Sequence, residues 1–154
     1  NEINLAVERG EVQGRCGWSW ASIKSTHPHW LREGEVDIQV QLSLSKHADL
    51  PNLPLVMDLA KTDEERQIFR LVFARNVMGR PFVSGPGIPA DRAAALRGAF
   101  EATLRDPELR AEADKINLEV NPVSGEEIQK IVLDAHRTPA AIVRRTGELL
   151  KGPN

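Results

Sequence analysis

The residues from Arg80 to Val132 constrain the fold most strongly, because signals that start and stop helices follow one another there at short intervals. Arg80–Ser84 combines adjacent apolar residues with a proline, which is typical of a short strand near a sheet edge. Gly85-Pro86-Gly87 predicts a break in the chain directly afterwards. The sequence therefore predicts a strand, a corner and then a series of helices.

Three capping signals divide the rest of this stretch. Asp91 precedes a run of apolar residues at helical spacing, and Asp106-Pro107 supplies an N-cap residue followed by proline at the first helical position. Ser124 and Glu127 form a capping box, and Leu118–Val120 before it alternates as a brief strand would. The apolar faces predicted for the three helices contain Leu96, Phe100, Leu104, Leu109, Ala113, Ile116, Ile128, Ile131, Val132 and Ala135.

Upstream of Arg80, the sequence predicts helices that alternate with strands. Glu2–Arg9 predicts a helix ended by Gly10, and Val12–Cys16 predicts a strand. Ser22–Leu31 predicts a helix interrupted at His27-Pro28. Val36–Leu44 alternates apolar and polar residues and is the clearest predicted strand.

Two further helices complete the prediction. Thr62–Glu65 is a second capping box, and the helix that follows has a broad apolar side and stops at Gly79. Thr138-Pro139 begins a last helix, for which we expect Ile142, Val143, Leu149 and Leu150 to face inward.

Composition excludes several functional classes. The formal net charge of −2 gives no global attraction to nucleic acid or to an anionic membrane. The single cysteine, Cys16, excludes an internal disulfide, and we expect a buried structural thiol. No nucleophile with an adjacent base and no phosphate-binding loop stands at a recognisable spacing, so we expect neither an enzyme, nor a catalytic residue, nor a cofactor. His27 and His29 suggest a metal or a turn, and the turn is favoured because no other ligand residue stands at metal-binding spacing.

The turn after the predicted Val12–Cys16 strand is the most unusual segment. Gly17-Trp18-Ser19-Trp20 places two indoles, a hydroxyl and a glycine where an α/β sheet usually forms its ligand crevice. Indoles combine apolar area with a hydrogen-bond donor, and serine can donate to a carboxylate. The alternative is that Trp18 and Trp20 only fill space in the core.

The motifs together resemble the C-terminal half of the solute-binding receptors of tripartite tricarboxylate transporters, the Bug family of type 2 periplasmic binding proteins. The motifs that carry the resemblance are Gly10-Glu11-Val12, Gly34-Glu35-Val36, Asp49–Pro54, Pro86-Gly87-Ile88-Pro89, Asp106-Pro107-Glu108 and Ser124–Glu127. The resemblance implies an α/β fold of two lobes with helices packed on short mixed sheets. Residues 1–79 would belong to the second lobe, residues 80–154 would form the crossover strand and the helices that return to the first lobe, and the receptor's N-terminal half would be absent.

By the same resemblance, the protein is expected in the periplasm, where it would capture a small carboxylated organic anion and present it to membrane transporter subunits. Gly17, Trp18, Ser19 and Trp20 would line the ligand cleft, with Arg80 as a further ligand-binding residue at the crossover. The alternative for Arg80, and also for Arg75, is a solvated charge. Many family members have an acidic residue in the turn, and its replacement here favours a dicarboxylate or an aromatic acid over an amino acid.

Two other functions stay open. The chain could be the ligand-sensing domain of a transcriptional regulator of the same fold, or a helical interaction module without a small ligand. Without a first lobe, the apolar faces around Leu96, Phe100, Ile128 and Ile131 would lack a partner. We therefore expect a homo-oligomer, because large apolar surfaces are normally covered by association.

Overall fold

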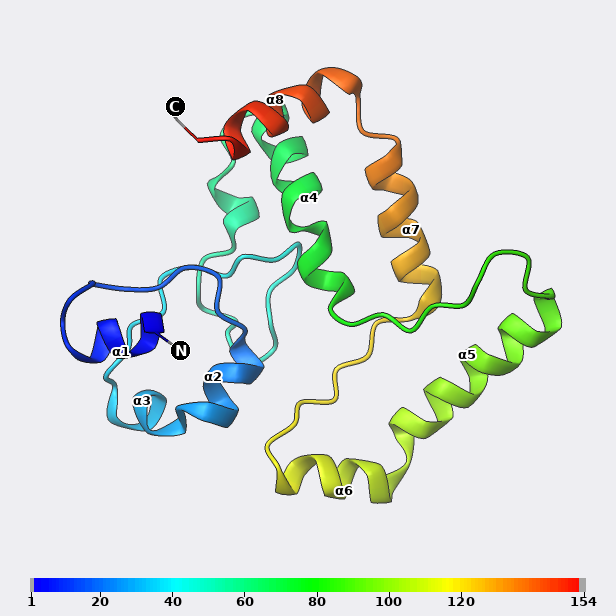
Figure 1. The fold of residues 1–154 in the computed structure, drawn as a ribbon, viewed down its shortest axis with the longest axis horizontal. Coiled ribbons are helices and arrows are strands. Elements are labelled where there is room, and N and C mark those ends of the chain that lie inside the picture. Colours follow the sequence, from blue (N-terminus) through cyan, green and yellow to red (C-terminus); the bar gives the residue numbers. More distant parts are fainter. Residues whose placement is uncertain (1, 153–154) are drawn as a thin grey trace. The chain divides into compact units, whose positions relative to one another are not determined.

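The computed structural model describes residues 2–152, which are 58% helical. Its elements are α1 (Glu2–Glu8), α2 (Trp20–Thr26), α3 (Pro28–Glu33), the 3-10 helix η1 (Val56–Leu59), α4 (Asp63–Met78), α5 (Ala90–Arg105), α6 (Pro107–Lys115), α7 (Gly125–His136) and α8 (Ala140–Leu150) (Figure 1). All the helices predicted from the sequence are present. None of them, within the described residues, is long and apolar enough to cross a membrane.

The predicted α/β fold is wrong, because residues 2–152 contain no sheet. Val12–Cys16, Val36–Leu44, Arg80–Ser84 and Leu118–Val120 were each predicted as strands, and each is a loop or an extended segment instead. A strand needs a neighbour to accept its backbone hydrogen bonds. Among these four segments, Val36–Leu44 forms one isolated parallel β-bridge, between Gln41 and Leu55.

The contacts divide the chain into two compact units. Unit 1 comprises the residues up to Asp37 together with Pro107–Val120, and unit 2 comprises Ile38–Asp106 together with the residues from Asn121 onward. The predicted division into lobes at residues 79 and 80 concerns a complete two-lobed receptor and stays a prediction.

The core of unit 2 is built around η1. Leu55, Val56 and Met57 are buried, and partly buried apolar side chains pack against them: Val40, Leu42, Leu44, Phe69 and Phe73. The alternation that predicted a strand over Val36–Leu44 thus serves a different purpose. It directs apolar side chains from an extended segment onto a short helical turn.

Gln41 holds the loop beside this core. Its side chain is buried, donates to the carbonyls of Leu50 (2.8 Å) and Leu53 (3.2 Å), and accepts from the backbone N–H of His47 (2.8 Å). Its backbone N–H also donates to Pro54 at 2.9 Å. Gln41 is one of the polar residues of the predicted Val36–Leu44 strand, and it is nevertheless the most buried residue of that segment.

Two predicted capping boxes start helices in unit 2. The hydroxyl of Thr62 accepts from the backbone N–H of Glu65 at 3.1 Å, and Ser124 accepts from Glu127 at 3.2 Å. The α4 helix that follows Thr62 contacts both α7 and α8 (Figure 1). Arg97 of α5 pairs with Glu126 in the first turn of α7 at 2.8 Å.

The apolar faces are less well covered than predicted. Val143, Leu149 and Leu150 of α8 were expected to face inward, but all three are exposed, while Thr146 is buried. On α5, Leu96 is 59% exposed, and Phe100 is exposed as well. Helical spacing identifies an apolar stripe but does not supply the surface that would cover it.

Candidate functional site

The turn singled out in the sequence lies in unit 1, between α1 and α2. Gly17 has a φ of +74°, a left-handed conformation that residues with a Cβ rarely adopt. Ser19 occupies the N-cap position of α2, but its hydroxyl makes no capping hydrogen bond there. The backbone turns at Gly17, and the side chain of Trp18 points toward α3.

Trp18 packs edge-on against two rings of the α2–α3 segment. Its ring centroid lies 5.0 Å from that of His27 and 5.5 Å from that of Trp30, at interplanar angles of 75° and 83°. The ring centroids of His27 and Trp30 lie 4.5 Å apart. Edge-to-face pairs of this kind are stabilising beyond their apolar burial. We call Trp18, His27 and Trp30 the aromatic cluster.

The break between α2 and α3 fixes the orientation of His27. The Thr26 hydroxyl donates to the Ser22 carbonyl at 2.6 Å and lies 2.7 Å from Nδ1 of His27. A hydroxyl has a single proton, so the imidazole Nδ1–H must donate to the threonine oxygen. This hydrogen bond assigns the tautomer and leaves Nε2 as the acceptor of the neutral ring.

Arg15 adds a positive charge to the aromatic cluster. Its guanidinium carbon lies 4.7 Å from the ring centroid of Trp18, within the range of a cation–π interaction. Its Nη1 donates to Oδ1 of Asn4 at 2.6 Å, and Asn4 is buried in α1. Because a guanidinium has five N–H donors, four remain for a solvent molecule or a ligand at this exposed position.

Four of the five predicted ligand-binding residues belong to unit 1 and the fifth belongs to unit 2. Gly17, Trp18 and Ser19 lie at the aromatic cluster, whereas Trp20 begins α2. The ring centroid of Trp20 lies 5.4 Å from Nζ of Lys24. Arg80 is exposed and belongs to unit 2. Trp18 and Trp20 are both half-buried, so neither is simply a residue of the core.

Sequence reasoning missed three participants: Arg15, His27 as a ring partner, and Trp30 as the buried ring of the cluster. Trp30 is 4% exposed. The signal was present, since His27 and Trp30 are three residues apart and therefore share one side of a helical segment. Arg15 carried no local signal, because its contact with Asn4 depends on the turn between them.

Two expectations about reactive side chains can be compared with the structure. Cys16 was expected to be buried, but its thiol is exposed, because Val12–Cys16 is not a strand packed in a core. His27 and His29 lie 6.1 Å apart between ring centroids. Within the described part of the chain, no group of three potential ligand residues could hold a metal ion.

The geometry places the Arg15 guanidinium, which Asn4 holds, over the half-buried Trp18 ring of the aromatic cluster. Comparison with protein-family models, curated proteins and solved structures found no match to this chain. The aromatic cluster and Arg15 together suit an anion with apolar parts, because the Arg15 guanidinium can bind its charge and the rings can contact the rest.

Proposed function

We propose that this chain is part of a periplasmic solute-binding receptor, which binds a small organic carboxylate at the Trp18 turn and presents it to the membrane subunits of a tripartite tricarboxylate transporter. The turn and its aromatic cluster supply the binding surface.

The observation that carries the proposal is the position of Arg15 over Trp18, 4.7 Å from the ring centroid. The planar guanidinium can donate two parallel hydrogen bonds to the two oxygens of a carboxylate. Asn4 holds Nη1 of this guanidinium, so part of the entropy cost of ordering the side chain is met before a ligand binds.

Neighbouring groups favour a dicarboxylate or an aromatic acid. Ser19 is exposed beside Trp18, and its hydroxyl makes no cap hydrogen bond. It is therefore suited to donate to a second carboxylate oxygen. An aromatic acid would instead gain contact with the half-buried Trp18 ring.

The order of the sequence motifs supports the receptor assignment. Asp106-Pro107 stands where α5 ends and α6 begins, and the Ser124 capping box opens α7. These motifs coincide with helix boundaries in the order that the resemblance implies. Pro89 likewise ends the Gly/Pro corner and is the N-cap of α5.

A titration monitored by tryptophan fluorescence tests the binding function. Glutarate and benzoate would be compared with their uncharged counterparts, glutaramide and benzamide. We expect saturable changes with the acids alone, and weaker binding by Arg15→Gln. Arg32→Gln is the matched control, because Arg32 is an exposed arginine of the same unit. The absence of saturable binding by either acid would refute the proposal.

A further inference from the structure

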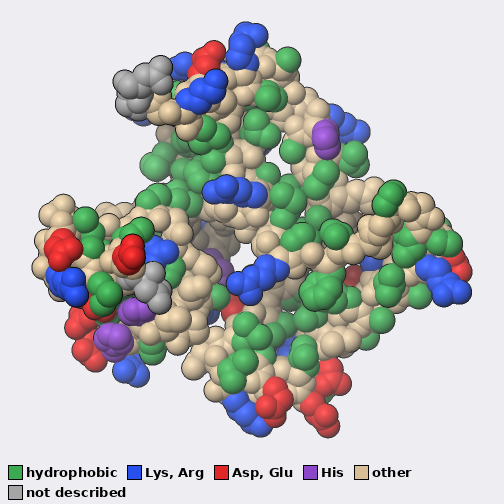
Figure 2. Space-filling model, viewed as in Figure 1, with side chains coloured by type: hydrophobic (Ala, Val, Ile, Leu, Met, Phe, Trp, Pro, Cys, Tyr) green, Lys and Arg blue, Asp and Glu red, His purple; other side chains and the backbone are tan. Residues whose placement is uncertain are grey.

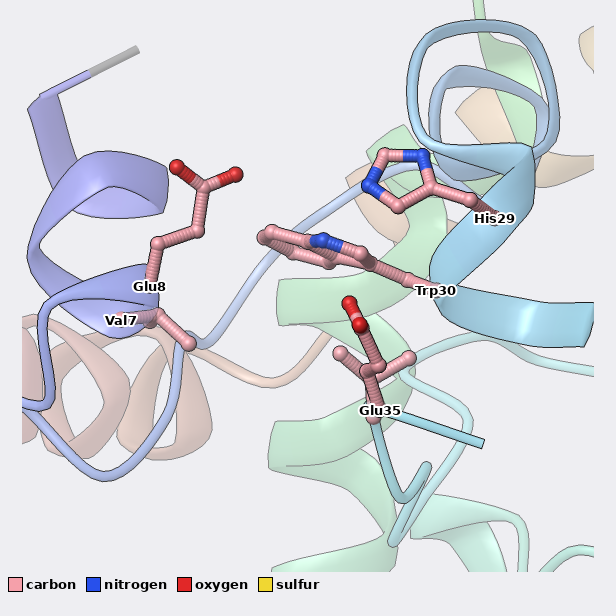
Figure 3. A pocket seen from close by; sticks show the side chains of 6 residues that line it. Val7, Glu8, His29, Trp30 and Glu35 are labelled. Carbon is pink, nitrogen blue, oxygen red and sulfur yellow. The ribbon is translucent and has the colours of Figure 1, made fainter. Parts of the chain in front are cut away.

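A recess lies in unit 1 beside Trp30. It has a volume of about 460 Å³, within the usual range of small-molecule sites, and is open to solvent. Its lining residues are Val7, Glu8, His29, Trp30, Glu35 and Val36. Figure 3 shows Glu8 to one side of the Trp30 indole and Glu35 beneath it.

Local backbone geometry fixes one of these carboxylates beside the indole. Gly34 ends α3 with a φ of 68°, and its N–H donates to the Trp30 carbonyl. The N–H of Glu35 donates to the same carbonyl at 2.9 Å. This left-handed cap reverses the chain, so the Glu35 side chain returns toward Trp30 (Figure 3).

The second carboxylate comes from another helix. Glu8 is the last residue of α1, where the negative end of the helix dipole offers it no stabilisation. Neither the Glu8 nor the Glu35 carboxylate has a hydrogen-bond or ion-pair partner among residues 2–152. Two uncompensated negative charges therefore share one recess.

The remaining lining residues restrict the chemistry of a ligand. Val7 and Val36 are half-buried and supply apolar contact beside the carboxylates. A metal ion is disfavoured, since no group of three potential ligand residues within the described range could hold one. A carboxylic acid would be repelled by Glu8 and Glu35, so this recess is distinct from the surface proposed for the organic acid.

We infer that the recess binds a primary ammonium group on a short aliphatic chain, with Glu8 and Glu35 accepting its N–H donors, the indole of Trp30 as floor and the two valines against the alkyl part. An ammonium has three donors, which two carboxylates can share. The aromatic floor adds attraction for a cation.

The test is an NMR titration with butylammonium, followed at the three indole N–H signals, which Trp→Phe variants assign. Butanol and butyrate are the neutral and anionic counterparts. We expect saturable shifts at Trp30 with butylammonium alone and a dissociation constant on the order of 1 mM, weaker at high salt. Glu8→Gln and Glu35→Gln should each weaken binding about two- to fivefold, the range for exposed ion pairs.

Glu33→Gln is the matched control, because it removes the same charge from α3 outside the recess. The inference is overturned if butylammonium gives no saturable shift at Trp30, if butanol binds equally well, or if Glu33→Gln weakens binding as much as Glu35→Gln. Each of these results is independent of acid binding at Arg15, so the two proposals stand or fall separately.

Discussion

Arg15 donates a 2.6 Å hydrogen bond from Nη1 to Oδ1 of Asn4, and Asn4 is 4% exposed. The bond joins α1 to the turn that carries Trp18. It satisfies a buried amide oxygen with a charged donor, and the same guanidinium lies over the Trp18 ring. One side chain thus connects the packing of unit 1 to its proposed binding surface.

Asn4→Ala should therefore destabilise unit 1. The loss of a hydrogen bond to a charged group costs about 1.5–3 kcal/mol. Urea denaturation followed by tryptophan fluorescence measures this loss, because all three tryptophans lie in unit 1 and the chain has no tyrosine. Asn52→Ala, at an exposed position of unit 2, should leave the transition unchanged. Equal midpoints for Asn4→Ala and wild type would contradict the anchoring role.

Gln41→Ala should destabilise unit 2. The substitution removes the partner of the His47 N–H and of the Leu50 and Leu53 carbonyls, and an unsatisfied buried polar group costs about 1–3 kcal/mol. Urea denaturation monitored by circular dichroism measures the change. The control is Gln67→Ala on α4, for which we expect a smaller effect. A loss no larger than the control's would show that the Gln41 hydrogen bonds do not hold the loop.

The capping box of α7 should make stability depend on pH. Hydrogen bonds from the Ser124 hydroxyl and backbone N–H hold the pKa of Glu127 below its ordinary value of 4.5. Because the folded pKa is lower than the unfolded one, the stabilisation is complete above the ordinary value and is lost as pH falls through the folded pKa. NMR titration should show the Glu127 pKa rising toward 4.5 in Ser124→Ala, and an unchanged value would contradict the assigned cause.

The exposed apolar residues near α5 should promote self-association, and we propose the homo-oligomer expected from the sequence. Phe82 is 84% exposed although its ring centroid lies 4.9 Å from that of Phe100. Leu96, one helical turn before Phe100, is also exposed. Figure 2 shows hydrophobic side chains at the surface over α5. Size-exclusion chromatography with light scattering should detect a dimer or larger species that Phe82→Ser reduces. A monodisperse monomer for the wild type would contradict this prediction.

The helix boundaries could be predicted because the signals that set them are local. The hydroxyls of Thr62 and Ser124 bond within their own first turns, and Gly79 follows the last residue of α4, as predicted. Pro28 interrupts the α2–α3 segment where the sequence indicated. Such signals require no information about distant residues.

The strands could not be predicted from alternation alone. Val36–Leu44 has the pattern of a half-buried strand, but Val40, Leu42 and Leu44 pack on the Leu55–Met57 turn without a sheet. A pattern of period two describes which side is buried and says nothing about the hydrogen-bond partner. The Arg15–Trp18 contact was missed for a similar reason, since it depends on how the turn returns to α1.

The most direct test of the proposed function is isothermal titration calorimetry of wild type and Arg15→Gln with glutarate. We predict saturable binding by the wild type, no binding of glutaramide, and an affinity at least about tenfold lower for Arg15→Gln, because a hydrogen-bonded charged pair contributes about 1.5–3 kcal/mol. Equal affinities of the two proteins for glutarate, or the absence of heat from both glutarate and benzoate, would contradict carboxylate binding at the Trp18 turn.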